Sequence, residues 1–155
     1  MWYERLIADP TNQDILAECI EYYESELDDA KKEIIVKGKL QDLSAKMPSI
    51  VEHRYAQLQE LESVLKFYEI RYNEAKGLAF RAYLESKNTA LALSSRDAEK
   101  FAECDKDVVG FADIIIYIEL IRNKYSSILK GLDVKGFQLN NIIKLRCAGL
   151  EDATI

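Results

Sequence analysis

The chain has 155 residues, which is the length of a single domain. Apolar residues make up 48% of it and charged residues 31%, a balance that excludes an intrinsically disordered chain and suits a globular or coiled-coil one. The formal net charge of −6 argues against a general attraction to nucleic acid or anionic membranes, so binding of that kind needs a local basic face.

Cysteine usage and hydropathy indicate a cytoplasmic protein without a membrane partner. The three cysteines form no CxxC pair, which is typical of a reducing compartment where cysteine acts as a small apolar residue. No apolar secretory stretch follows the first five residues. The longest apolar run, residues 114–118, is far too short to span a bilayer.

The first predicted helix covers residues 11–37. Residues 9–12 (Asp-Pro-Thr-Asn) form a helix-start signal. Beyond them, apolar residues recur at alternating spacings of four and three and form one seam: Leu16, Ile20, Tyr23, Leu27, Ala30 and Ile34. Gly38 ends or loosens this helix. Residues 39–47 leave two alternatives open, since their leucines could extend the helix or pack a short turn.

The second predicted helix covers residues 48–86, because Pro48 suits only the first turn of a helix. Its seam changes from leucine to tyrosine to alanine along the chain: Leu58, Leu61, Leu65, Tyr68, Tyr72, Ala75, Ala79 and Ala82. The small side chains at the C-terminal end of this seam predict that another helix approaches closely there.

Residues 85–96 lose the pattern and are rich in short polar side chains, so we expect a loop in which Ser94 or Ser95 caps the next helix. That helix is predicted over residues 97–130. The β-branched residues at 113–120 favour a strand. The same apolar seam continues on both sides of them, however, and turn residues are lacking nearby, so we favour the helix.

Gly131 and Gly136 are expected to end this helix, and a short final helix is predicted over residues 138–147. Its region carries apolar side chains that we expect to take part in assembly: Phe137, Leu139, Ile142, Ile143 and Leu145.

These elements predict an all-α fold in a single helical domain over residues 1–155, a long-helix bundle with coiled-coil-like seams. Two prolines and six glycines are too few for the turns of an all-β chain. The three long helices far exceed the globular average of about 11–12 residues. A monomer this thin could hardly cover their seams, so we expect apolar surface to be buried between the subunits of a homo-oligomer.

Charge is strongly segregated along the chain. Residues 14–29 contain seven acidic side chains and no Lys or Arg, whereas residues 120–146 contain six basic side chains and one acidic one, a net charge of +5. Such runs are usually solvated faces. An alternative is that the acidic segment answers the basic one, between helices or between subunits.

Cations of the second predicted helix recur about every five residues and alternate with aromatic side chains: Lys66, Arg71, Lys76, Arg81 and Lys87 with Phe67, Tyr68, Tyr72, Phe80 and Tyr83. Proteins that bind single-stranded nucleic acid pair these residue types, since cations follow the phosphates and aromatic faces stack on unpaired bases. The competing interpretation is that Tyr68 and Tyr72 belong to the core, because both fall on the seam.

No catalytic motif stands out. The chain has no phosphate loop, no GxGxxG, no nucleophile elbow and no HExxH. His53 is the only histidine, and its neighbour Glu52 is adjacent to it, so the two side chains do not face each other on a helix. We therefore expect no enzymatic activity, no cofactor and no metal site.

Several segments of the second half resemble the UvsY family, the recombination mediators of T-even-like phages. They are residues 102–108 (Ala-Glu-Cys-Asp-Lys-Asp-Val), 135–137 (Lys-Gly-Phe) and 142–146 (Ile-Ile-Lys-Leu-Arg). Upstream, residues 78–83 (Leu-Ala-Phe-Arg-Ala-Tyr) fall where the family has a Leu-Lys-x-Arg motif followed by tyrosines. The resemblance covers roughly residues 50–148.

The resemblance implies a ring-shaped homo-oligomer that binds single-stranded DNA and loads a RecA-like recombinase onto it while displacing the single-strand-binding protein. It also implies the host cytoplasm as the location. Arg81 matches the family's DNA-binding Arg, while Ala79 stands at the position of its Lys. Lys76 lies three residues earlier and is expected to compensate. The predicted DNA-binding residues are Lys66, Arg71, Lys76, Arg81, Tyr83 and Lys87.

Three hypotheses follow. The first is the recombination mediator. The second is a helical structural or scaffolding protein that oligomerises without binding nucleic acid. The third, an enzyme, has the least support, because the sequence shows no catalytic constellation.

Overall fold

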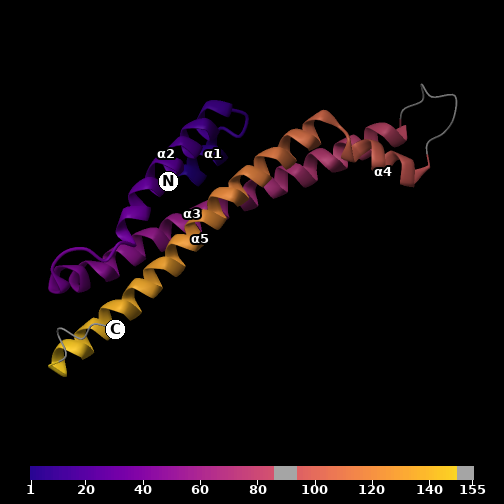
Figure 1. Ribbon diagram of the computed structural model, residues 1–155. Helices are drawn as coiled ribbons and strands as arrows, with labels where there is room; N and C mark the ends of the chain where they lie inside the picture. Colours follow the sequence, from indigo (N-terminus) through magenta and orange to yellow (C-terminus); the bar gives the residue numbers. More distant parts are fainter. Residues whose placement is uncertain (86–93, 150–155) are drawn as a thin grey trace.

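The computed structural model describes residues 1–85 and 94–149, and the regular structure in these ranges is helical throughout. The helices are α1 (Trp2–Ala8), α2 (Gln13–Glu33), α3 (Leu40–Glu85), α4 (Ser95–Glu103) and α5 (Lys106–Cys147). Figure 1 shows α3 and α5 as two long rods lying side by side, with α1 and α2 against one side of them and α4 at one end. The predicted all-α class is therefore confirmed.

Short polar side chains start three of the helices. Asn12 accepts a hydrogen bond from the Asp14 N–H and caps α2, and Asp105 caps α5 in the same way. Ser94, one of the two predicted caps, starts α4 by accepting from the Asp97 N–H. Each cap satisfies a backbone donor that the first helical turn leaves without a partner.

Two of the predicted bounds in the first half are wrong. The helix expected over residues 11–37 ends at Glu33, and the one expected over 48–86 already begins at Leu40. Pro48 therefore lies inside α3. Proline has no N–H to donate to the carbonyl four residues earlier, but the Pro48 side chain is exposed, so water can reach that carbonyl. Met47 and Ile50, beside Pro48, pack onto the core. α1 was not predicted at all. The loop expected over residues 85–96 lies mostly outside the described residues.

The second half departs from prediction in two places. The helix expected over 97–130 is divided into α4 and α5 at Cys104 and Asp105, because Asp105 starts a new helix. α5 then continues to Cys147, so the separate helix expected over 138–147 is its last part. Gly131 and Gly136, which were expected to end the helix, both lie inside α5. At Gly131 the absence of a side chain leaves room for Ile34. A Cβ atom there would lie 2.8 Å from Cδ1 of Ile34.

The main core lies where α1, α2, α3 and α5 meet. Tyr23 of α2 and Tyr125 of α5 are fully buried, with ring centroids 5.7 Å apart in an edge-to-face arrangement. The Tyr125 hydroxyl donates to the Tyr23 carbonyl oxygen at 3.1 Å, and the Tyr23 hydroxyl donates to Glu60 at 3.0 Å. Glu60 also accepts from the Trp2 N–H, which ties α1 to α3. Burial, together with the Glu60 carboxylate, raises the pKa of Tyr23, so its hydroxyl stays a donor.

A buried arginine fastens α2 to α3. Arg54 is 3% exposed and donates to both carboxylate oxygens of Glu33 at 2.8 Å and to Glu26 at 2.7 Å. The bidentate pairing with Glu33 suits the planar guanidinium. Lys135 of α5, also buried, donates to the Glu33 carbonyl oxygen, so the C-terminal end of α2 is held by both long helices. We call Arg54, Glu26 and Glu33 the Arg54 cluster.

The acidic segment of residues 14–29 does not pair with the basic segment of residues 120–146. Six of its seven acidic side chains are exposed, and none of the seven forms a salt bridge with α5 within the described residues. Glu24 accepts a hydrogen bond from Tyr117 of α5 at 2.7 Å, but the cation that pairs with Glu26 comes from α3. The alternative in which these segments pair between helices of one chain is therefore not what the described residues show.

Replacing Arg54 tests the Arg54 cluster. Arg54→Ala leaves two partly buried carboxylates without their partner, so we expect the free energy of unfolding to fall by about 2–3 kcal/mol. Lys31→Ala removes an exposed pair with Asp28 and is the control, with an expected loss below about 0.5 kcal/mol. Urea unfolding followed by circular dichroism measures both, and equal losses would contradict the role given to Arg54.

Acid should weaken the same cluster. Hydrogen bonds from Arg54 lower the pKa of Glu26 below its usual 4.5, so the stability that Glu26 contributes is present above that pH and is lost as the pH falls through the lowered value. We expect the free energy of unfolding to decline between about pH 5 and about pH 3, and to decline less in Arg54→Ala. The same decline in both chains would show that the acid sensitivity arises elsewhere.

Gly131 and Gly77 form a matched pair of helical glycines. A methyl group at Gly77 meets nothing within 4 Å, so Gly77→Ala should stabilise the protein by about 0.5–1 kcal/mol through helix propensity. At Gly131 the methyl group meets Ile34, so Gly131→Ala should lose that gain, with a difference of at least about 1 kcal/mol between the variants. Thermal unfolding of both variants measures it, and equal stabilisation would argue against close packing of Ile34 on α5.

Candidate nucleic-acid interface

A groove of about 770 Å³ lies between α3 and the first turns of α5, with the turn before α2 along one side. We call it the α3–α5 groove. Ala75, Ala79 and Ala82 of α3 line it together with Gly110 of α5, so small residues from both helices form part of its wall. Leu78, which is 67% exposed, and Phe111 add larger apolar surface.

The close helix approach predicted for the alanine end of the α3 seam is present. Ala79 packs in one buried cluster with Ala102 of α4 and Val108 of α5. Ala79 is 9% exposed, so a lysine in its place would have to displace one of these neighbours. This explains in physical terms why an alanine rather than a basic residue occupies position 79 here.

Charged side chains of both signs line the α3–α5 groove. Arg71 pairs with Glu74 at 2.9 Å, and its guanidinium lies 5.2 Å from the centroid of the Phe67 ring. Lys106 is exposed at the start of α5. Asp105 is already engaged, since it accepts the capping bond from the Asp107 N–H and a 3.5 Å hydrogen bond from the Tyr83 hydroxyl. The groove therefore offers Arg71 and Lys106 to an anion, with Glu74 and Asp107 opposing them.

The predicted DNA-binding cations do not form one surface. Lys76 pairs with Glu103 of α4 at 2.9 Å, which raises the pKa of the Lys76 ammonium, and it lines a separate hollow with Phe80 and Ser95. Lys66 pairs with Glu69 at 2.8 Å and is exposed. Five residues correspond to about 140° of rotation on a helix, so successive cations point to different sides of α3.

Arg81 has the most open position among them. It is exposed and makes no salt bridge within the described part of the chain. It lies seven residues after Glu74, which lines the α3–α5 groove, so the two share a face of α3. Tyr83 is half-buried, with its ring centroid 5.7 Å from that of Phe101. Lys87 lies outside the described residues.

Most of the aromatic side chains that alternate with these cations are packed inside the protein. Phe67 and Tyr68 are 8% and 4% exposed in the main core, which confirms the core interpretation for Tyr68. Tyr72 and Phe80 are partly buried against the Ala79 cluster. Few rings therefore remain free to stack on bases.

Lys106 was not among the predicted DNA-binding residues. It stands between Asp105 and Asp107, inside the helix that was predicted over residues 97–130. The signal that could have found it is the capping position of Asp105, because a helix that begins there presents Lys106 in its first turn beside the facing helix.

The apolar residues predicted for assembly divide into two groups. Phe137, Ile143 and Leu145 are 71%, 37% and 45% exposed. Leu139 is 3% exposed within the single chain, so it belongs to the packing of α5 and is not available to a second copy. Ile142 is partly buried.

No cluster of three or more His, Cys, Asp or Glu side chains that could hold a metal ion occurs in residues 1–85 and 94–149. His53 is exposed, with its Nε2 atom 3.7 Å from the Glu26 carboxylate that Arg54 also binds. None of the helices in these ranges has both the length and the apolar character needed to cross a membrane.

Comparison of this chain with protein-family models, with curated proteins and with solved structures gives no match.

Proposed function

We propose that this protein is a recombination mediator: a helical homo-oligomer, in the form of a ring, that binds single-stranded DNA and promotes the loading of a RecA-like recombinase. The observation that carries the proposal is the α3–α5 groove. Residues 78–83 and 102–108 are two of the segments that resemble the recombination mediators, and both contribute to this one groove. Their resemblance therefore concerns one surface of the protein and not two unrelated helices.

Charge and shape support single-stranded DNA as the ligand. Lys106 and Arg71 line the groove and Arg81 extends the same face of α3, so three cations lie along a path that a phosphate backbone could follow. The exposed Leu78 and the partly buried Phe111 offer apolar contact to bases without a paired partner. Exposed salt bridges such as that of Arg71 with Glu74 stabilise a protein by only about 0–1 kcal/mol, so a phosphate can replace the carboxylate.

The recombinase and the single-strand-binding protein enter the proposal through the resemblance alone. Displacement of a single-strand-binding protein requires that the mediator hold the same strand, so DNA binding is the step to test first.

The scaffolding function is the second candidate, and two observations favour it. Glutamates already neutralise Lys66, Arg71 and Lys76, and the core takes up Phe67 and Tyr68. A scaffold would use its exposed apolar surface for assembly and would leave nucleic acid unbound.

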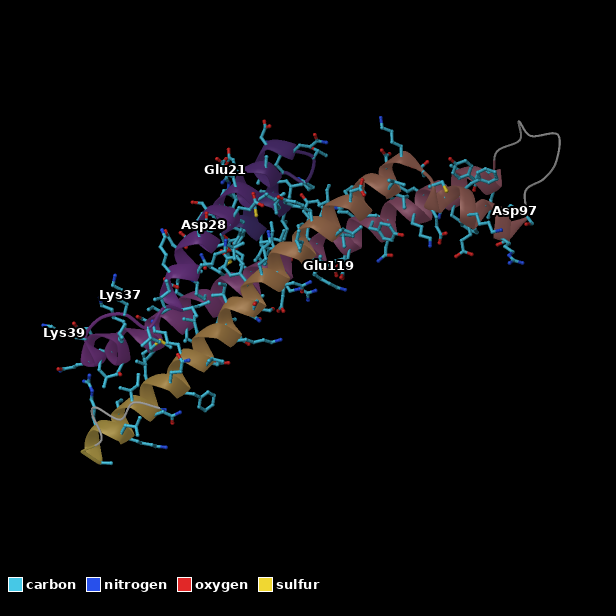
Figure 2. All side chains as sticks on the ribbon, viewed as in Figure 1. Glu21, Asp28, Lys37, Lys39, Asp97 and Glu119 are labelled. Carbon is cyan, nitrogen blue, oxygen red and sulfur yellow. The ribbon has the colours of Figure 1, made fainter. Side chains whose placement is uncertain are left out.

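Fluorescence anisotropy of a labelled single-stranded oligonucleotide separates the two functions. Arg81→Ala/Lys106→Ala removes the exposed Lys106 of the groove and the exposed Arg81 on the same face of α3. It should weaken binding about tenfold, while reducing the slope of log affinity against log salt by about 1.4. Lys37→Ala/Lys39→Ala removes two exposed cations at the opposite end of the molecule from Asp97 of α4, as Figure 2 shows, and should change neither quantity.

Three outcomes would contradict the assignment. Equal losses in the two double variants would mean that binding follows charge in general and not the groove. Weaker oligonucleotide binding by Lys66→Ala/Lys76→Ala, with unchanged binding by Arg81→Ala/Lys106→Ala, would mean that the DNA binds to a different side of α3. No binding by the unaltered protein at low salt would favour the scaffold.

A further inference from the structure

α5 carries a covered apolar seam on one side and, on the opposite side, an exposed seam of mixed apolar and polar residues. The covered seam faces the other helices of the chain through Ile121, Tyr125, Ile128, Leu132 and Leu139. The second seam follows spacings of four and three without a break, through Ile116, Leu120, Asn123, Ser127, Lys130, Val134, Phe137, Asn141 and Lys144. Every one of these nine side chains is exposed. We call them the outer seam.

The outer seam has the period of a coiled coil and extends over about four heptads, roughly 42 Å of helix. Its apolar members lie toward its two ends. Ile116 and Leu120 are 64% and 49% exposed, and Val134 and Phe137 are 55% and 71% exposed. Between these pairs lie Asn123, Ser127 and Lys130. The two apolar pairs are therefore placed symmetrically about Ser127 with polar residues between them, and the polar residues Asn141 and Lys144 extend the outer seam beyond the second pair.

Charge along α5 runs from acidic to basic. Asp107, Asp113 and Glu119 are the acidic residues between positions 107 and 119, where no Lys or Arg occurs. Lys106 precedes this acidic part, and the helix after position 119 carries Arg122, Lys124, Lys130, Lys135, Lys144 and Arg146 against Asp133 alone. Of these cations, Lys124, Lys130, Lys144 and Arg146 are exposed and make no salt bridge within the described residues.

We propose that the outer seam is the contact with a second copy of this chain, in which the two α5 helices pack antiparallel about a two-fold axis near Ser127. The inference rests on the self-association in the proposed function and adds the surface and its symmetry. An antiparallel pair places Ile116 and Leu120 of one copy against Val134 and Phe137 of the other. It also brings the acidic beginning of each α5 to the basic end of its partner.

A parallel pair has neither advantage. It would place Lys130 and Lys144 of one copy beside the same lysines of the other, where like charges repel. The polar centre of the outer seam serves the antiparallel pair in a further way. Asn123, Ser127 and Lys130 favour positions in which their polar groups meet, which selects one register at some cost in stability. A ring built with this two-fold contact contains an even number of chains and uses a second contact to close.

Substitutions on the outer seam test the contact without disturbing the folded chain, because the residues concerned are exposed. Phe137→Glu should convert the dimer or larger assembly to a species with half its mass or less, measured by sedimentation velocity in the absence of nucleic acid. Ile70→Glu places the same charge on an exposed apolar position of α3, 51% exposed, and should leave the mass unchanged. Unchanged helicity by circular dichroism in both variants confirms that the chain itself remains folded.

A charge exchange tests the antiparallel direction. Asp113→Lys and Lys144→Asp should each weaken self-association about tenfold, and both changes in one chain should restore it. The two positions are about 46 Å apart on one helix, so restoration can arise only between copies. The proposal would be overturned if the two losses of self-association added up in the double variant. It would also be overturned if Phe137→Glu had the same mass as the unaltered protein.

The result is independent of the DNA-binding site. Loss of self-association with retained affinity of the monomer for a short oligonucleotide would leave the groove assignment in place. Self-association through the outer seam without DNA binding would support this inference and remove the mediator function.

Discussion

Arg54 forms the buried ion pairs that connect α2 to α3. Its guanidinium lies inside the protein and binds the carboxylate of Glu33 at the end of α2 and that of Glu26, seven residues earlier in the same helix. Lys135 of α5 then takes the last carbonyl of α2. The short N-terminal layer is thereby held in one position on the α3–α5 pair, so Tyr23 can bury its ring against Tyr125 and Ile34 can enter the space beside Gly131.

This layer covers one part of a long helical pair and leaves the rest thinly covered. Beyond it in one direction, α4 packs against α3 and α5, and its Ala102 is buried with Ala79 and Val108. In the other direction the end of α5 projects with Phe137 almost fully exposed. A thin rod cannot bury both sides of its long helices, and exposed apolar residues at coiled-coil spacing are a usual site of association. This shape supports the assembly through α5 that we propose.

Periodicity in the sequence was enough to predict the all-helical class and the core seam of α3, but it missed α1 and the division between α4 and α5. Leu58, Leu61, Leu65 and Tyr68 were predicted as one seam and are buried together. Rules for single residues failed where distant packing decided the outcome. Glycine often ends a helix, but Gly131 lies inside α5, where it leaves room for the side chain of Ile34 at the end of α2. Pro48 is tolerated inside α3 because it faces solvent. The break at Asp105 carries no proline or glycine, so a capping side chain was its one local signal.

The candidate site was harder to predict than the fold. The sequence places Lys66, Arg71, Lys76 and Arg81 in one series, but a helix distributes residues spaced by five over different sides. The contribution of Lys106 depends on α5 returning beside α3, which linear spacing does not reveal. In the sequence the outer seam appears only as a mixture of polar and apolar residues at helical spacing. Its significance emerges only once the opposite seam is known to be filled.

Native mass spectrometry of the unaltered protein, with and without a single-stranded oligonucleotide, tests the central claim that this chain is an assembling DNA-binding subunit. We expect masses at even multiples of 17.8 kDa and an added oligonucleotide on those species. A mass of 17.8 kDa under both conditions would contradict the account. Multiples that never gain the oligonucleotide would leave an assembly protein without the proposed DNA-binding function.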